Sequence, residues 1–146
     1  MHNNKPVVMW IEDHFDLDMN EILSYLKETN KYDLVIANDQ ETAEKELNRS
    51  GRAIPSLIIL DIILPTGSKV AGSYEDDILG GGIRFYDKHI KPRRIKTLVL
   101  SCRDDEDAVN AFEGDENVVY LLKPVWPYRL EERLDDLLEQ ELKPNE

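Results

Sequence analysis

Five polar side chains each follow a short apolar run of this sequence: Glu12, Asp13, Asp61, Ser101 and Lys123. Carboxylates crowded into a small volume repel one another unless a cation lies among them, and Mg²⁺ takes carboxylate, water and phosphate oxygens as ligands. An aspartate can also attack phosphorus and form an aspartyl-phosphate. The lysine and the serine could then supply the positive charge and the hydrogen-bond donor that phosphoryl oxygens need. If these side chains meet, they fit Mg²⁺-assisted phosphoryl chemistry.

The apolar runs predict the strands that would position these side chains. Each run is nearly continuous rather than alternating, which is typical of strands buried on both faces of a parallel sheet. The predicted strands are Val7–Ile11, Leu34–Ile36, Leu57–Leu60, Leu98–Leu100 and Val118–Leu122.

Amphipathic patterns between the runs predict helices, so strand and helix alternate along the chain. This alternation indicates an α/β fold with right-handed crossovers and helices on both faces of a parallel sheet. Ligands of such sheets bind at the carboxyl ends of the strands, so the polar side chains there should converge. The predicted helices contain Met19–Leu26, Ala43–Leu47, Ile83–Tyr86, Ala108–Phe112 and Leu130–Leu138.

Length and composition exclude several classes of protein. The 146 residues suit one domain, and 30 Asp+Glu against 18 Lys+Arg give a formal charge of −12. That charge argues against binding nucleic acid or an anionic membrane surface. One cysteine excludes an internal disulfide and a multi-cysteine metal site. No apolar run approaches the roughly 20 residues of a membrane span, and Met1–Trp10 lacks a signal peptide's apolar stretch, so a cytoplasmic location is predicted.

Taken in chain order, these residues resemble the receiver domain of response regulators in two-component signalling. Pro65, four residues after Asp61, and Tyr120, three before Lys123, complete the resemblance. It covers the chain apart from Thr66–Gly82. It implies a flavodoxin-like fold, a doubly wound five-stranded parallel sheet of order 2-1-3-4-5. The expected organisation is a single receiver domain over residues 1–146 with no output domain.

The resemblance also implies roles for individual residues. Asp61 would accept a phosphoryl group from a histidine kinase, a phosphotransfer protein or a small acyl phosphate. Lys123 and Ser101 would contact the phosphoryl oxygens, so the chain would be a phosphoacceptor regulator rather than an enzyme. The Mg²⁺ ligands would be Asp13, Glu12 through a water, Asp61 and the backbone carbonyl of Ile63.

A switch is implied as well. Movement of Ser101 toward the phosphoryl group would open space that Tyr120 fills. The altered surface would lie on the fourth helix, fifth strand and fifth helix, where a downstream protein would dock. Phosphorylation could also drive homodimerisation.

Two departures from the family pattern carry further expectations. Thr66–Gly82 is too long for an ordinary loop, so it is interpreted as an insertion that displaces Gly82 and Ile83, the expected start of the third helix. Its acids Glu75–Asp77 have no assigned role; the segment could be a lid, a recognition element or filler. Ile63 and Arg103 occupy the variable positions beside the site, and because an apolar Ile63 cannot orient an attacking water, self-dephosphorylation should be slow.

Other interpretations stay open. The chain could be a phosphorylation-independent adaptor that uses the receiver fold as a scaffold, or a hydrolase with an aspartyl intermediate. Ser101 could cap the following helix, and Tyr120 could be a core residue. A group of basic residues near the end of the third helix could complement the helix dipole or bind a partner; it comprises Lys88, Lys91, Arg93, Arg94 and Lys96.

Overall fold

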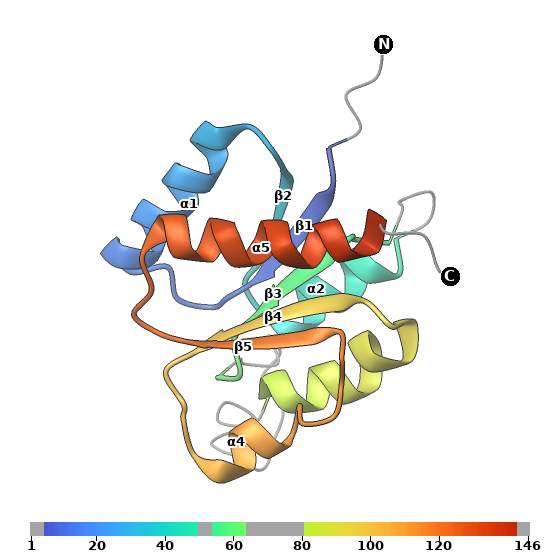
Figure 1. Ribbon diagram of the computed structural model, residues 1–146. Helices are drawn as coiled ribbons and strands as arrows, with labels where there is room; N and C mark the ends of the chain where they lie inside the picture. Colours follow the sequence, from blue (N-terminus) through green and yellow to red (C-terminus); the bar gives the residue numbers. More distant parts are fainter. Residues whose placement is uncertain (1–4, 50–53, 64–80, 143–146) are drawn as a thin grey trace.

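The computed structural model describes residues 5–49, 54–63 and 81–142, and these form one α/β unit around a five-stranded parallel sheet (Figure 1). Its strand order, β2-β1-β3-β4-β5, is the predicted one. β2 and β4 extend beyond their apolar cores into polar residues. The strands are β1 (Val7–Ile11), β2 (Asp33–Ala37), β3 (Leu57–Leu60), β4 (Lys96–Ser101) and β5 (Val118–Leu122).

Helices cover both faces of the sheet, as predicted. Residues 81–85 form a helix that continues into a π-helical segment, η1 (Tyr86–Ile90), and a 3-10 segment, η2 (Lys91–Arg93). None of the helices in the described part of the chain has the length and apolarity that a membrane span needs. The remaining helices are α1 (Leu17–Thr29), α2 (Gln40–Leu47), α4 (Glu106–Asn110) and α5 (Pro127–Leu142).

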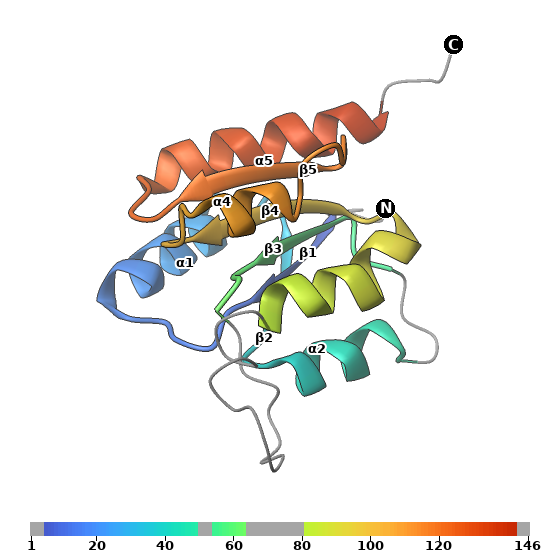
Figure 2. The same ribbon diagram turned by 90° about the horizontal axis from the view of Figure 1, so that it is seen from below.

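The core has two halves, one on each face of the sheet. Figure 2 shows α1 and α5 on one side and α2 with the helix that leads into η1 on the other. Alternate residues of β1 serve the two halves: Trp10 packs with α1 and α5, whereas Met9 and Ile11 pack with the opposite helices. Burying one such side chain stabilises the fold by roughly 1.5–3 kcal/mol. The continuous apolar runs reflect this two-sided burial.

Aspartates begin three of the helices. The carboxylates of Asp16, Asp39 and Asp105 accept hydrogen bonds from the backbone N–H groups of Met19, Thr42 and Ala108, respectively. Each satisfies a donor that has no partner within the helix. Asp39 is therefore the cap of α2. Pro127 begins α5, where its missing N–H leaves no hydrogen bond unmade.

The strand register brings the predicted chemistry to one edge of the sheet. Ile11 pairs with both Ala37 and Leu60, and Leu60 pairs with Val99. Ser101 pairs with Leu122 at the end of β5. Because the strands are parallel, the residues that follow them lie at the same edge.

Candidate phosphoacceptor and metal site

The end of β1 places one buried and one exposed carboxylate side by side. The backbone N–H of Glu12 donates to the carbonyl of Ala37 at 2.9 Å, which continues the pairing of β1 with β2 by one residue. Glu12 is 1% exposed, whereas Asp13 is exposed. The N–H of His14 and the side-chain amide of Asn38 donate to the Glu12 carboxylate and backbone carbonyl, respectively. Glu12 is therefore fixed by β1, and Asp13 faces solvent.

Asp61 lies directly after β3 and is 5% exposed. Its N–H donates to the carbonyl of Ile11 at 3.2 Å, and its Oδ1 accepts from the N–H of Ile63 at 3.1 Å. The helix over residues 81–85 passes so close that a Cβ on Gly82 would lie 2.2 Å from the backbone oxygen of Asp61. Only glycine permits this approach, because a side chain at position 82 would collide with the backbone of Asp61. Gly82 therefore allows this helix to pack directly against the backbone of Asp61.

Lys123 joins the two buried carboxylates. Its backbone N–H donates to the carbonyl of Ser101 at 2.9 Å, and its peptide bond to Pro124 is cis. Its Nζ lies 2.8 Å from Glu12 Oε1 and 3.1 Å from Asp61 Oδ2. One ammonium therefore bridges the ends of β1 and β3 from the end of β5.

The electrostatics show more negative charge than Lys123 offsets. Burial, together with the neighbouring Asp61, raises the pKa of Glu12 to about 8. Burial and the charge of Asp61 also raise the pKa of Asp13. Burial acts to lower the pKa of Lys123, but the Asp61 and Glu12 carboxylates outweigh it and the net shift is upward. Close carboxylates disfavour each other's ionised form, so a further cation would stabilise this site.

The donor set fits a hard divalent cation. Glu12, Asp13 and Asp61 each offer a carboxylate oxygen, and these oxygens lie within 4.8 Å of one another. Oxygen ligands of this kind suit Mg²⁺. All three predicted side-chain ligands meet, whereas the backbone carbonyl of Ile63 as a ligand stays a prediction.

Ser101 and Tyr120 lie next to this group but are held by different contacts. Ser101 is fully buried, and its Oγ accepts from the N–H of Arg103 at 3.3 Å. The idea that Ser101 caps the next helix is wrong, because Asp105 caps α4. The half-buried Tyr120 donates from its hydroxyl to the carbonyl of Arg103 at 2.6 Å. The switch roles of Ser101 and Tyr120 stay predictions.

Two features of the site were not predicted from the sequence. Arg103 forms a bidentate ion pair with Asp105, through Nε at 2.8 Å and a terminal guanidinium nitrogen at 2.7 Å. The position of Asp105 just before the predicted helix could have indicated that it caps α4. No sequence signal predicted its ion pair with Arg103. Phe112 stacks edge-to-face on Tyr120, with ring centroids 6.0 Å apart, so the tyrosine belongs to an aromatic group.

Some sequence expectations lie outside the described residues. Pro65, the acids Glu75–Asp77 and nearly all of the Thr66–Gly82 segment fall within residues 64–80. Gly82 and Ile83 are described and are helical, in line with their expected place at the start of the third helix.

Comparison with curated proteins found a relative of known class. The chain is 30% identical over 132 residues to the phosphate regulon transcriptional regulatory protein PhoB of Escherichia coli K12, and to its counterpart in Shigella flexneri. The match includes 87% of this chain and 49% of that protein, so the chain spans about half the length of these relatives. No family model matches the sequence.

Comparison with solved structures points the same way. A signal receiver domain from Vibrio parahaemolyticus matches with a TM-score of 0.65 and 25% identity, over 93% of this chain and 92% of that one. A CheY-like response regulator receiver domain protein from Methanospirillum hungatei has the same fold, with a TM-score of 0.67, 19% identity, and coverage of 94% and 96%. Since the relatives, the sheet order and the residues at the sheet edge agree, the chain belongs to the response-regulator receiver domains.

Proposed function

We propose that this chain is the phosphoacceptor of a two-component phosphorelay and that Asp61 receives the phosphoryl group. The observation that carries the proposal is the contact of Lys123 Nζ with both Asp61 and Glu12, at 3.1 and 2.8 Å, inside the cluster of three carboxylates. The cluster would hold Mg²⁺, and Lys123 lies where it can contact an oxygen of a phosphoryl group on Asp61.

The chemistry needs few parts. One carboxylate oxygen of Asp61 would attack phosphorus while the bond to the leaving group breaks and that group takes the electron pair. The leaving group would be the imidazole of a phosphohistidine in a kinase or phosphotransfer protein, or the carboxylate of an acyl phosphate. Bound Mg²⁺ would offset the charge of the carboxylates and of the phosphoryl oxygens. Lys123 would add a fixed positive charge, and the Ser101 hydroxyl would donate to one oxygen.

The proposed output is a change in a protein-binding surface on α4, β5 and α5. Among the described residues, large apolar side chains are exposed on or beside each of these elements: Val109 on α4, Leu122 on β5, and Trp126 and Tyr128 at the start of α5. Trp126 is 71% exposed. Exposed apolar side chains gathered on neighbouring elements are typical of surfaces that bind another protein. A downstream protein or a second copy of the chain would dock there.

The experiment treats the purified protein with acetyl phosphate and Mg²⁺ and measures intact mass. We expect a gain of one phosphoryl group that needs Mg²⁺ and is lost in Asp61→Asn. Asp87→Asn, which changes an exposed aspartate outside the site, is the matched control and should be phosphorylated like the wild type. Absence of any mass gain at saturating Mg²⁺ would favour the adaptor, and continuous phosphate release over many turnovers would favour a hydrolase.

A second measurement tests the switch. Beryllofluoride, which mimics a phosphoryl group on an aspartate, should change hydrogen exchange in α4 and β5. Asp61→Asn should show no such change. The fluorescence of Trp10, two residues before Glu12 and fully buried, should report the same event in a Trp126→Phe background, which removes the exposed indole. A wild-type protein whose exchange is unchanged by beryllofluoride would contradict the switch.

A further inference from the structure

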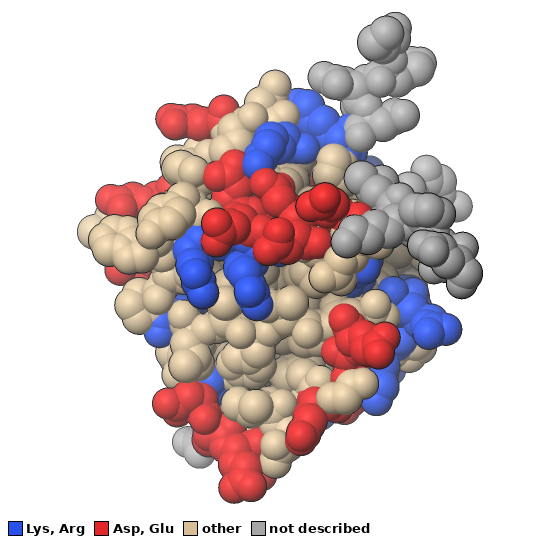
Figure 3. Space-filling model, in the orientation of Figure 1, with Lys and Arg blue, Asp and Glu red and all other residues tan. Residues whose placement is uncertain are grey.

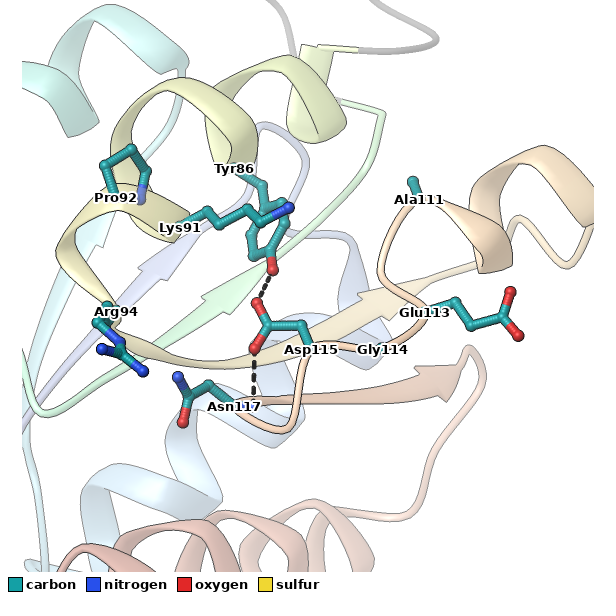
Figure 4. Close-up of a pocket in the computed structure, with 9 residues that line it drawn as sticks. All are labelled: Tyr86, Lys91, Pro92, Arg94, Ala111, Glu113, Gly114, Asp115 and Asn117. Atoms are coloured by element: carbon teal, nitrogen blue, oxygen red, sulfur yellow. Dashed lines mark hydrogen bonds between the residues drawn. The ribbon is translucent and has the colours of Figure 1, made fainter.

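A cavity lies at the opposite end of the sheet from the carboxylate cluster. Its volume is about 480 Å³, within the roughly 300–1,000 Å³ range of small-molecule sites. It lies between η2 and the loop from α4 to β5, beside the beginnings of β4 and β5 (Figure 4). Its position excludes any part in the phosphoryl site, which is built at the carboxyl ends of the strands.

Two cations of this cavity have no anionic partner. Lys91 and Arg94 line it, and within the described residues neither side chain forms an ion pair or a hydrogen bond. Figure 4 shows the Lys91 side chain extending toward Tyr86 and the Arg94 side chain extending toward Asn117. Figure 3 shows blue side chains near the right edge of the molecule, in the part occupied by η1 and η2, apart from the acids over α5. Both side chains are exposed, so an anion from solution can reach them in a chain whose net charge is −12.

The acids of the cavity do not neutralise both cations. Asp115 already accepts two hydrogen bonds: its Oδ2 from the Tyr86 hydroxyl, and its Oδ1 from the N–H of Asn117 at 2.9 Å. Figure 4 shows the carboxylate of Glu113 pointing away from Lys91 and Arg94. Two positive charges therefore face one committed carboxylate, which leaves a positive excess in the cavity.

Arg94 ends η2 and offers a guanidinium group to the cavity. Arg94 has a φ of 56°, in the left-handed region that residues other than glycine and asparagine rarely adopt. Here the conformation is that of the C-cap of η2, in which the N–H of Arg94 donates to the carbonyl of Lys91 at 3.0 Å. The fork of this guanidinium matches the two oxygens of a phosphate or carboxylate.

We propose that this cavity binds a small molecule through an oxyanion group, a phosphate or a carboxylate, held by Lys91 and Arg94. Tyr86, which lines the cavity, stacks edge-to-face on Phe112 with centroids 4.8 Å apart, and Phe112 stacks on Tyr120. The ligand would therefore alter the packing of Tyr120. This last step rests on the switch role of Tyr120 in the proposed function, whereas the binding step does not.

The binding test uses inorganic phosphate and citrate as separate probes, without Mg²⁺ and at constant ionic strength. Amide chemical shifts of Arg94 and Asn117 should move with a saturable dependence on the probe. Because each cation would form a charge-assisted hydrogen bond with the oxyanion, Lys91→Ala and Arg94→Asn should each weaken binding at least about tenfold. Asparagine tolerates the left-handed conformation of Arg94. Lys88→Ala removes a neighbouring exposed cation that does not line the cavity and should bind like the wild type.

The outcomes separate the sources and the steps. Tighter binding of phosphate indicates a phosphate ester, and tighter binding of citrate indicates a carboxylate ligand. Equal weakening by Lys88→Ala, or no saturable shift with either probe, would overturn the site. In the wild type the amides of Arg103 and Tyr120 should also shift, and Phe112→Leu should abolish that response while Arg94 still responds. An unchanged Tyr120 response in Phe112→Leu would overturn the aromatic route, and neither result depends on phosphorylation of Asp61.

Discussion

At the scale of single residues, burial decides what each carboxylate can do. The buried carboxylates of Asp61 and Glu12 both contact the ammonium group of Lys123, whereas Asp13 is exposed to solvent. The residue types after the strands predicted this group, because parallel strands bring their ends together whatever their side chains. The lysine's contact with Glu12 as well as Asp61 was not predictable, since it depends on where the end of β5 lies relative to β1.

Ile63 offers a prediction about the lifetime of the phosphorylated protein. Its N–H is bonded to Asp61 Oδ1, so its side chain begins close to the site but carries no group that could orient a water. Arg103 is engaged by Asp105. We expect slow loss of the phosphoryl group and an acceleration of about tenfold in Ile63→Asn. A well-positioned acid or base contributes about 10²–10⁴-fold to a rate, and an amide that only orients the attacking water should contribute less. Intact mass followed over time measures the rate.

The control for Ile63→Asn is Leu17→Asn, which places the same side chain outside the site. Leu17 is an apolar residue that is 84% exposed. It should leave the half-life unchanged. A half-life of seconds for the wild-type protein, or identical rates for wild type and Ile63→Asn, would contradict this account of the position.

At the scale of elements, the spacing of apolar residues along the sequence predicted most of the helices and strands. Continuous apolar runs predicted the strands, and amphipathic patterns predicted helices where α2 and α5 lie. The change from helix to η1 and η2 was not predictable, because it depends on how residues 86–93 return to β4. There Arg93 donates to the carbonyl of His89 and to the side chain of Asn48, a residue far away in the sequence.

η1 also contains a group whose protonation should affect stability. His89 lies 3.3 Å from Glu44 of α2 and packs on the ring of Phe85. Burial lowers the pKa of His89 despite the attraction of Glu44. The unfolded chain therefore binds a proton more readily than the folded one, and the free energy of unfolding should fall as pH drops below about 6.5.

Urea unfolding of wild type and His89→Asn at several pH values measures this effect. The difference in unfolding free energy between the two proteins should stay constant above about pH 7.5, where the imidazole is neutral in both states. It should then change in favour of the variant toward pH 5.5. Parallel pH profiles for the two proteins would show that His89 does not titrate differently on folding.

At the scale of the whole molecule, the negative charge has two parts. Much of it is spread over the surface, as in the band of acids that Figure 3 shows over α5, where Glu131 and Asp135 pair with Lys31. The remainder is concentrated in the site, where Glu12, Asp13 and Asp61 exceed the charge of Lys123. The first part responds to any salt, because screening weakens repulsion between exposed charges. The second should respond only to a cation that the carboxylates can ligate.

Thermal unfolding in NaCl and in MgCl₂ at matched ionic strength separates the two parts. NaCl should raise the midpoint slightly in all variants. Mg²⁺ should raise it further in the wild type, because a ligand present at about 100 times its Kd stabilises the folded state by about 2.7 kcal/mol, which corresponds to several degrees for a domain of this size.

The informative quantity is the Mg²⁺ increment and not the midpoint itself. Asp13→Asn and Asp61→Asn relieve repulsion, so these variants could melt above the wild type without any metal. Their Mg²⁺ increment over NaCl should nevertheless vanish, whereas Asp87→Asn should keep the wild-type increment. An increment that survives in Asp61→Asn and Asp13→Asn alike would place the magnesium effect on the diffuse surface charge and would remove the metal from the proposed phosphoryl chemistry.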